Sequence, residues 1–375
     1  MTEARQIEPW LRLVRADNPS PMTGAGTNTW ILGQDRLVVI DPGPQDTAHL
    51  AAIAGAIAGR SVEAILVTHA HLDHSALVPD LVRLTAVPVL GFGRADAGRS
   101  PLMQALAATG QGGGEGRDDA FVPDVCLHDG QILPFAGMQI GVIHTPGHMS
   151  GHLCFTVGDA LFSGDHVMGW SSSLVSPPDG DMGAYIASLR RLMGHGAIRG
   201  TAARDEMCGD RPADRAAEAT RDGVGAGDLS PSQAELPRSV ALQTVVPPSS
   251  SMQSARRLSK TPDFSPPERA EPASVVPGQG WRVFYPGHGE AVTDPRARLS
   301  ELLAHRLSRE AAILEALALT PSTPDQLVAR IYIGVPDGLR PAARRSIFAH
   351  LIDLHERNKV IADPALSDTA RYTLI

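Results

Sequence analysis

Cysteine is scarce in this chain of 375 residues, which contains three cysteines and no C-x-x-C pair. Cys126, Cys154 and Cys208 are odd in number and widely spaced, so neither a disulfide framework nor a thiolate zinc site is expected. A chain of this length has room for two domains and for a core that needs no covalent cross-links. We therefore expect a reducing compartment and thiols without a structural role.

Long hydrophobic runs are also missing. The longest apolar stretch, residues 50–58, is rich in alanine and glycine and falls short of the roughly 20 residues that span a bilayer. It fits a helix packed on the core. Residues 1–20 carry charges of both signs and lack the apolar segment of a secretory signal. These absences predict a soluble, cytoplasmic protein without a membrane partner.

An excess of positive charge is absent too. Lysine and arginine number 33 against 41 aspartates and glutamates, which gives a formal net charge of −8. A chain that is acidic as a whole has no general attraction for polyanions. This balance argues against a dedicated nucleic-acid protein, although a local basic surface stays compatible with it. The sequence does not indicate an oligomeric state.

Histidine, by contrast, is concentrated directly after the apolar run 64–67. In an extended segment His69 and His71 point to the same side, because side chains alternate with a period of two. Asp73 and His74 follow as the chain turns, so four ligand atoms can converge on one small volume. Imidazole and carboxylate are ligands that zinc, iron and manganese accept. The segment therefore predicts a metal site.

Three further candidate ligands lie downstream, each in a turn rich in glycine. His148 and His288 each follow a Pro-Gly pair, and Asp165 follows Gly164. Apolar segments typical of strands precede them, at residues 140–143, 153–157, 160–162 and 283–285. Such a pattern predicts ligands carried on loops at the ends of strands.

The ordered pattern H-x-H-x-D-H, then H, then D, then H resembles that of the metallo-β-lactamase-fold hydrolases. The resemblance implies that His69, His71 and His148 hold a first divalent metal ion, that Asp73, His74 and His288 hold a second, and that Asp165 bridges both. Zinc is the default metal, and iron and manganese fit the same set. Two such ions share a hydroxide that acts as the nucleophile. Asp73 would be catalytic, orienting this hydroxide and returning its proton to the leaving group.

A residue beneath the predicted metals also fits this resemblance. The apolar run 36–40 predicts a buried strand that ends at Asp41. Asp41 would fix a ligand imidazole as an outer partner, cap the turn before Pro42, or do both. His144, His152 and His166 lie next to the predicted ligands, and we expect them to be structural or outer partners.

The chain divides into three parts by its pattern. Residues 7–198 and 281–294 alternate apolar runs with turns and helical patches, as in the αββα sandwich of the resembled family, an α/β (α+β) fold. Residues 199–280 are rich in proline, serine and charge without apolar periodicity, which predicts a disordered insertion. Residues 295–375 show helical periodicity again.

The last part resembles a winged-helix domain. Its first helix is marked by leucines, at positions 299, 302, 303, 307, 314 and 317. Thr323 and Gln326 form a capping-box start, and residues 341–359 and 371–375 predict a third helix and a β-prone tail. In such a domain Arg340, Arg344 and Arg345 could meet phosphates. Alternatively, the domain packs beside the active site and shapes its mouth.

Together the two domains resemble the β-lactamase-like protein 2 group, whose members include single-strand-selective endoribonucleases. Three functions are compatible with this pattern. The first is a phosphodiesterase acting on single-stranded RNA, and the second is an acyl hydrolase acting on a small-molecule thioester, ester or lactone. The third is a non-catalytic nucleic-acid-binding protein, which complete occupation of the seven ligand positions disfavours. Fold analogy alone does not decide among them.

Overall fold

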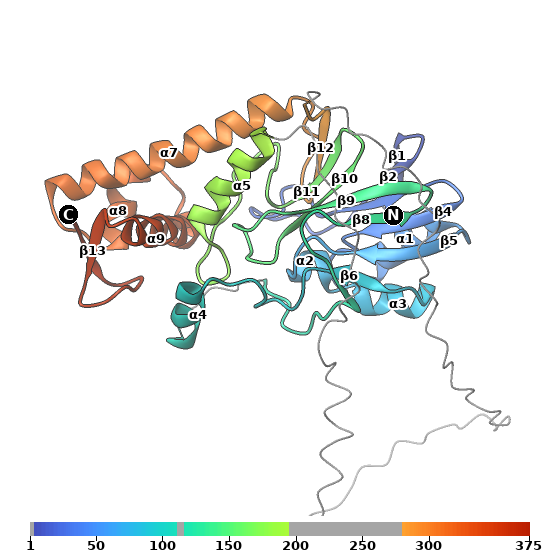
Figure 1. The fold of residues 1–375 in the computed structure, drawn as a ribbon, viewed down its shortest axis with the longest axis horizontal. Coiled ribbons are helices and arrows are strands. Elements are labelled where there is room, and N and C mark those ends of the chain that lie inside the picture. The colour runs from blue at the N-terminus through green and yellow to red at the C-terminus, as the bar shows by residue number, and fades with distance from the viewer. Residues whose placement is uncertain (1–3, 111–115, 195–279) are drawn as a thin grey trace, which may run out of the picture. The chain divides into compact units, whose positions relative to one another are not determined.

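The structure is a computed structural model that describes residues 4–110, 116–194 and 280–375 (Figure 1). Residues 199–279 of the expected insertion lie outside the described residues. Their disorder therefore stays a prediction, as do the domain boundaries drawn from the sequence.

The first of two large sheets contains seven strands in the order β1-β2-β3-β4-β5-β6-β7. These strands are β1 (Arg5–Glu8), β2 (Leu11–Arg15), β3 (Asn28–Leu32), β4 (Arg36–Ile40), β5 (Ser61–Leu66), β6 (Val89–Gly91) and β7 (Val125–Cys126). The strands from β1 to β4 pair antiparallel, whereas β4 to β7 pair parallel. The carboxyl ends of β4 and β5 therefore meet at one edge of the sheet.

The second sheet contains five strands in the order β12-β11-β10-β9-β8. They are β8 (Ile132–Phe135), β9 (Met138–His144), β10 (Leu153–Val157), β11 (Ala160–Gly164) and β12 (Val283–Pro286). Although β12 lies far along the chain, it pairs parallel with β11. Asp165 and His288, which follow these two strands, are thereby carried to the same edge.

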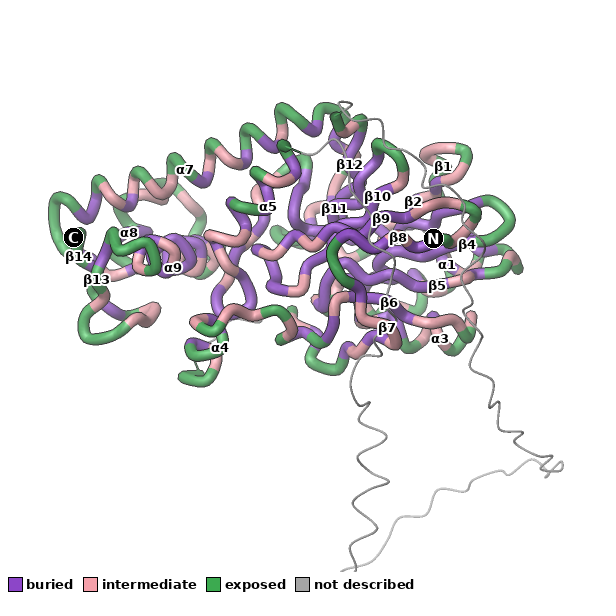
Figure 2. Tube along the Cα trace, in the orientation of Figure 1, coloured by how far each residue is buried: buried purple, intermediate pink, exposed green. Residues whose placement is uncertain are grey.

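The two sheets pack face to face around an apolar core. In β4, Val38 and Ile40 point into this core, while Leu37 and Val39 point to the opposite face. This alternation follows from the pleat, and all four side chains are fully buried because both faces of the sheet are covered (Figure 2).

Helices cover the outer faces. Helices α1 (Thr47–Ile57) and α3 (Val78–Thr85) lie on the first sheet, and α5 (Met182–Gly194) and α7 (Pro295–Leu319) lie on the second. The predicted αββα class is confirmed. Two further helices, α2 (Leu72–Ser75) and α4 (Pro101–Ala108), lie in the loops.

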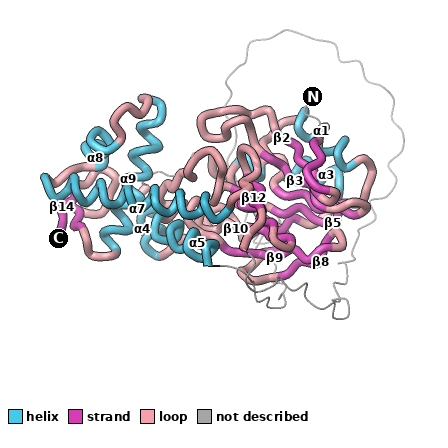
Figure 3. The backbone as a smooth tube through the Cα atoms, turned by 90° about the horizontal axis from the view of Figure 1, so that it is seen from above, coloured by secondary structure: helices cyan, strands magenta, loops and turns pink. Residues whose placement is uncertain are grey.

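The C-terminal domain has the predicted winged-helix elements (Figure 3). They are α7, α8 (Pro324–Ile331), α9 (Arg340–Glu356), β13 (Val360–Asp363) and β14 (Arg371–Leu374). The 3-10 turn η1 (Asp337–Leu339) is an additional element that the sequence did not predict. The capping box at Thr323 is present as predicted. Helix α9 ends at Glu356, earlier than expected, because Asn358 adopts a left-handed conformation with φ of 54°.

Helix α7 departs from its simple apolar pattern at one turn. Leu307 is 40% exposed, whereas the adjacent Arg306 is 2% exposed. A buried arginine on a helix that the leucine spacing marks as apolar indicates a specific polar contact, because an unpaired buried charge is strongly unfavourable.

Two findings bear on the expected location and redox state. Across the described residues, no helix combines the length and apolar character that a membrane span needs. Cys154 is a free thiol whose pKa is raised to about 12 by burial. Cys126 is disulfide-bonded, so the expectation of idle thiols is wrong there. A disulfide depends on a Cα separation below about 7 Å, which sequence spacing does not reveal. Location in the cytoplasm stays a prediction.

Candidate metal centre

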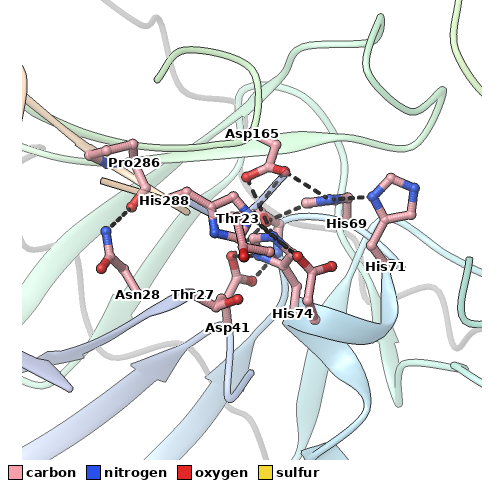
Figure 4. A network of polar contacts seen from close by, with 12 residues as sticks. Thr23, Thr27, Asn28, Asp41, His69, His71, His74, Asp165, Pro286 and His288 are labelled. Atoms are coloured by element: carbon pink, nitrogen blue, oxygen red, sulfur yellow. Dashed lines mark hydrogen bonds and ion pairs between the residues drawn. The ribbon is translucent and has the colours of Figure 1, made fainter. Parts of the chain in front are cut away.

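The strand ends of both sheets deliver the predicted ligands to one place. Asp41 follows β4 in a left-handed conformation, with φ of 51°, and its amide donates to Leu66 O at the end of β5. The chain after β5 then presents His69 and His71, and the single turn of α2 adds Asp73 and His74. The structure brings all seven predicted ligand side chains together. Figure 4 labels five of them, namely His69, His71, His74, Asp165 and His288.

One group of nitrogen atoms is built around His71. Its Nδ1 lies 3.0 Å from Nε2 of His69 and 3.0 Å from Nε2 of His148. A second group is built around His288. Its Nε2 lies 3.2 Å from Oδ2 of Asp73 and 3.3 Å from Nε2 of His74.

Asp165 lies between these two groups. Its Oδ2 is 3.7 Å from Nε2 of His148, 4.0 Å from Nε2 of His69 and 3.4 Å from Nε2 of His288. Its Oδ1 is 3.4 Å from Nε2 of His74. One carboxylate therefore faces both groups.

Backbone carbonyls fix two of the imidazoles. Nδ1 of His148 lies 2.7 Å from Leu174 O, and Nδ1 of His288 lies 3.3 Å from Gly26 O. A carbonyl oxygen only accepts, so each Nδ1 carries the proton and donates it. In the neutral ring each Nε2 then directs a lone pair into the site, as a metal ligand does.

The Asp41 carboxylate fixes the imidazole of His74 in a similar way. Its Oδ2 accepts hydrogen bonds from Nδ1 of His74 over 2.9 Å and from the Thr68 hydroxyl over 2.7 Å. Its Oδ1 accepts from the Thr68 amide over 2.8 Å. Thr68 Oγ1 in turn lies 3.0 Å from Nδ1 of His69. The structure thus places Asp41 in hydrogen-bond contact with His74, one of the predicted ligands, and its role as an outer partner of a metal stays a prediction.

These residues fit a bound divalent metal. Oδ1 of the buried Asp165 has no hydrogen-bond partner within the described part of the chain. A Cβ at Gly287 would lie 2.5 Å from that oxygen and 2.6 Å from Cε1 of His74, so only glycine leaves the space free. Zinc–nitrogen bonds of about 2.0–2.1 Å in tetrahedral geometry place ligand atoms roughly 3.3 Å apart. The spacings from His71 and His288 to the other members of their groups are 3.0–3.3 Å, and Oδ2 of Asp73 lies 3.7 Å from Nε2 of His74, all near this value.

Electrostatics divide the histidines into two sets. Burial, together with the facing imidazoles, lowers the pKa of His69 well below its ordinary value and lowers that of His71 to about 3. Burial lowers the pKa of His148 as well. These three rings are neutral at pH 7, the protonation state in which imidazole binds a metal.

The other set faces carboxylates. Burial opposes protonation of His74, but Asp165, Asp73 and Asp41 together raise its pKa well above the ordinary value. In the same way Asp165 and Asp73 overcome burial and raise the pKa of His288 to about 9. Burial would raise the pKa of Asp73, yet His74 and His288 lower it to about 2. This half of the site favours positive charge, which a metal ion would supply.

The neighbouring histidines have other contacts. Nε2 of His152 accepts from the Asp165 amide over 3.2 Å, and its Nδ1 lies 2.9 Å from Thr145 Oγ1. His144 stacks on Phe92 with ring centroids 4.4 Å apart. Neither these two residues nor His166 belongs to a group of convergent ligand atoms among the described residues.

Sequence reasoning missed several partners of the ligands. Leu174 and Gly26 act through backbone carbonyls, which leave no signal in residue type. The need for glycine at position 287 could have been inferred from the Pro-Gly-His motif. When a ligand directly follows a tight turn, the backbone of that turn lies close to the site and leaves no room for a side chain.

Comparisons with known proteins agree with this geometry. Residues 22–196 match the Metallo-beta-lactamase superfamily, and residues 323–367 match the Beta-lactamase associated winged helix domain. Lactamase-like protein nscB of Neosartorya fischeri is 33% identical over 204 residues, which cover 52% of this chain and 53% of the relative.

An atrochrysone carboxyl ACP thioesterase of Claviceps purpurea is 30% identical over 217 residues, 56% of this chain and 61% of the relative. The chain thus spans little more than half the length of these curated relatives. The crystal structure of a metallo-beta-lactamase family protein from Thermus thermophilus shares the fold with a TM-score of 0.62 at 20% identity, covering 99% of this chain and 100% of that one. The chain therefore contains a metallo-beta-lactamase superfamily domain at residues 22–196 and the associated winged helix domain at residues 323–367.

Proposed function

We propose that the protein is a metal-dependent acyl hydrolase that cleaves a small-molecule thioester or related ester. The observation that carries this proposal is the convergence of seven side chains into two ligand groups joined by Asp165. In this proposal His69, His71 and His148 hold one divalent ion, and Asp73, His74 and His288 hold the other. Zinc is the default by ligand type, and iron and manganese fit the same donors.

When bound, two such ions polarise the scissile carbonyl and lower the pKa of water, which supplies a nucleophile near neutral pH. The protein's own residues orient the ligands, and burial keeps the imidazoles of His69, His71 and His148 neutral. Asp73 is the catalytic residue of the proposal, because its side chain is 28% exposed and so opens toward the substrate side. It would receive the proton of the attacking water and pass it to the leaving thiolate, which gives a carboxylic acid and a thiol.

Apolar side chains beside the ligands support an acyl substrate. Leu72, between two proposed ligands, is 47% exposed, and Trp170 is 46% exposed. The indole of Trp170 lies against Gly289, directly after His288, since a Cβ at Gly289 would be 2.5 Å from its Cδ1. An exposed indole that packs on the turn after His288, and an exposed leucine next in the chain to two proposed ligands, favour an apolar group over a polyanion.

The named relatives point the same way. The Claviceps purpurea relative is named an acyl carrier protein (ACP) thioesterase, and none of the relatives compared supports an RNA substrate.

In the winged helix, Arg344 pairs with Asp325 over 3.0 Å and with Asp368 over 2.7 Å, which offsets its charge. Arg340 pairs with Asp337 over 3.1 Å. We therefore place the endoribonuclease function second, and the narrower likeness to the β-lactamase-like protein 2 group stays a prediction.

One experiment compares both functions. The zinc-loaded protein is incubated with an acyl thioester of N-acetylcysteamine, with release of the thiol followed by a thiol reagent. A labelled single-stranded RNA oligomer is tested in parallel. We expect thiol release that is lost in Asp73→Ala, with the RNA intact. RNA cleavage without thiol release would overturn the acyl-hydrolase proposal, and activity on neither substrate would favour a non-catalytic protein.

A further inference from the structure

Helix α7 of the C-terminal part reaches toward the metal centre through a buried arginine. The helix runs beside α5 of the sandwich (Figures 1 and 3). Arg306 projects from it, and its Nη2 donates a hydrogen bond to Ser173 O. Its guanidinium lies 5.0 Å from the ring centre of Tyr185. Its Nε has no partner among the residues the structure describes.

The segment that Arg306 contacts also holds two proposed ligands. Leu174 O, one residue further, accepts from Nδ1 of His148 over 2.7 Å. The Ser173 hydroxyl donates to Asp165 O. One dipeptide thus fixes the imidazole of His148 and the backbone of Asp165.

A second arginine of α7 holds the beginning of the same loop. Nε of Arg298 donates to Met168 O over 2.7 Å, and its Nη2 donates to Ser171 O over 2.6 Å. Two side chains of one helix therefore bond to three carbonyls of the loop that follows Asp165. Loops usually vary in position, and such a clamp removes that freedom.

We propose that Arg306 is a positioning residue for the metal centre. By holding Ser173 O, it sets the position of Leu174 O, which in turn fixes the proton of His148 on Nδ1 and leaves Nε2 free to bind. Burial of a guanidinium is unfavourable unless hydrogen bonds replace those lost to water, and the bond to Ser173 O supplies one of them. Ligand orientation thereby depends on the helix that leads into the winged helix. The proposal rests on the proposed metal site.

The test uses the full-length protein loaded with Co²⁺, whose visible absorption reports the ligand geometry. The variants are Arg306→Met and Arg306→Lys, and the matched control is Arg309→Met on the same helix. Arg309 stacks on Tyr332 at 4.8 Å, where it contacts neither the loop nor a ligand. Thermal unfolding of each metal-free variant is measured separately, so that a general loss of stability is distinguished from an effect on the ligands.

We expect Arg306→Met to weaken the first Co²⁺ equivalent by about 10–100-fold, the range typical for loss of an outer partner, and to change the absorption bands. Arg306→Lys should show a smaller change, and Arg309→Met should match the wild type. If Arg306→Met does not fold, Arg306→Lys decides. Wild-type affinity and spectrum in the folded Arg306 variants would overturn this inference alone. Absence of Co²⁺ binding by the wild type would overturn it together with the proposed metal site.

Discussion

Oδ2 of Asp41 lies 2.9 Å from Nδ1 of His74, and both side chains are buried. This hydrogen bond joins the end of β4 to the helical turn α2, and it leaves only Nε2 of His74 to face Asp165. The ligand is therefore oriented by the first sheet itself rather than by a mobile loop, a property expected of a preorganised site.

We predict that Asp41→Asn weakens metal binding by about 10–100-fold while the fold is kept. The asparagine oxygen would keep the Thr68 amide as its donor, so the asparagine amide group would face Nδ1 of His74. His74 would then move its proton to Nε2 and lose its lone pair toward the site. The measurement is metal content after dialysis against a chelator.

A control for this variant is Asp129→Asn, which removes a carboxylate that pairs with Arg191 over 2.8 Å outside the ligand groups. It should leave the metal content unchanged. Equal metal retention in Asp41→Asn and the wild type would show that the hydrogen bond does not orient His74 for binding.

Asp165→Ala is predicted to reduce bound metal from two equivalents to one or none. The reason is that Asp165, alone among the described residues, has oxygens facing both ligand groups, at 3.7 Å from Nε2 of His148 and 3.4 Å from Nε2 of His74. His288→Ala, at the second group only, should retain one equivalent. Elemental analysis of the purified variants makes the comparison, and two equivalents in Asp165→Ala would contradict the bridging role.

The convergence of the seven candidate ligands could be predicted from sequence, because they are histidines and aspartates at strand ends. The same holds for β4, whose apolar run begins and ends at the observed residues, and for α8, whose capping box marks its start. The parallel pairing of β11 with β12 has no such local signal, since it joins segments far apart in the chain.

The partners of the ligands were harder to predict for a physical reason. Leu174 O and Gly26 O are backbone atoms, which every residue type offers equally. Burial of Arg306 runs against the ordinary preference of arginine for solvent. From sequence, the neighbouring Leu307 is the expected core residue and Arg306 the expected exposed one. The hydrogen bond from Arg306 to Ser173 explains why Arg306 is buried and Leu307 is exposed instead.

Gly287→Ala is predicted to destabilise the protein by about 1–3 kcal/mol and to impair metal binding, because the added methyl would be forced onto ligand atoms. Its Cβ would lie 2.5 Å from Oδ1 of Asp165 and 2.6 Å from Cε1 of His74. Urea unfolding and metal content are measured together. Gly55→Ala is the matched control, since nothing lies within 4 Å of its Cβ and alanine favours helix α1. A Gly287→Ala protein with full metal content would show that the residues around the added methyl group can shift without loss of the ligand geometry.

His350 should make the fold sensitive to acid independently of the metal centre. Burial, with a further contribution from the charge of Arg306, lowers its pKa to about 3, against about 6.5 in an unfolded chain. Above pH 6.5 both states are neutral and this residue has no effect on stability. As the pH falls from 6.5 toward 3, the unfolded state binds a proton that the folded state does not, so stability is lost. At pH 5 the loss is about 2 kcal/mol.

The variant His350→Leu isolates this contribution, since neither ring nitrogen of His350 has a hydrogen-bond partner in the described part of the chain. Urea unfolding is measured at pH 7.5 and pH 5.0 for the wild type and the variant, both without metal. Other groups titrate alike in the two proteins, so the decrease in unfolding free energy should be about 2 kcal/mol smaller in His350→Leu. An equal decrease in both proteins would mean that His350 accepts a proton in the folded state, through an opening of the α7–α9 contact that admits water.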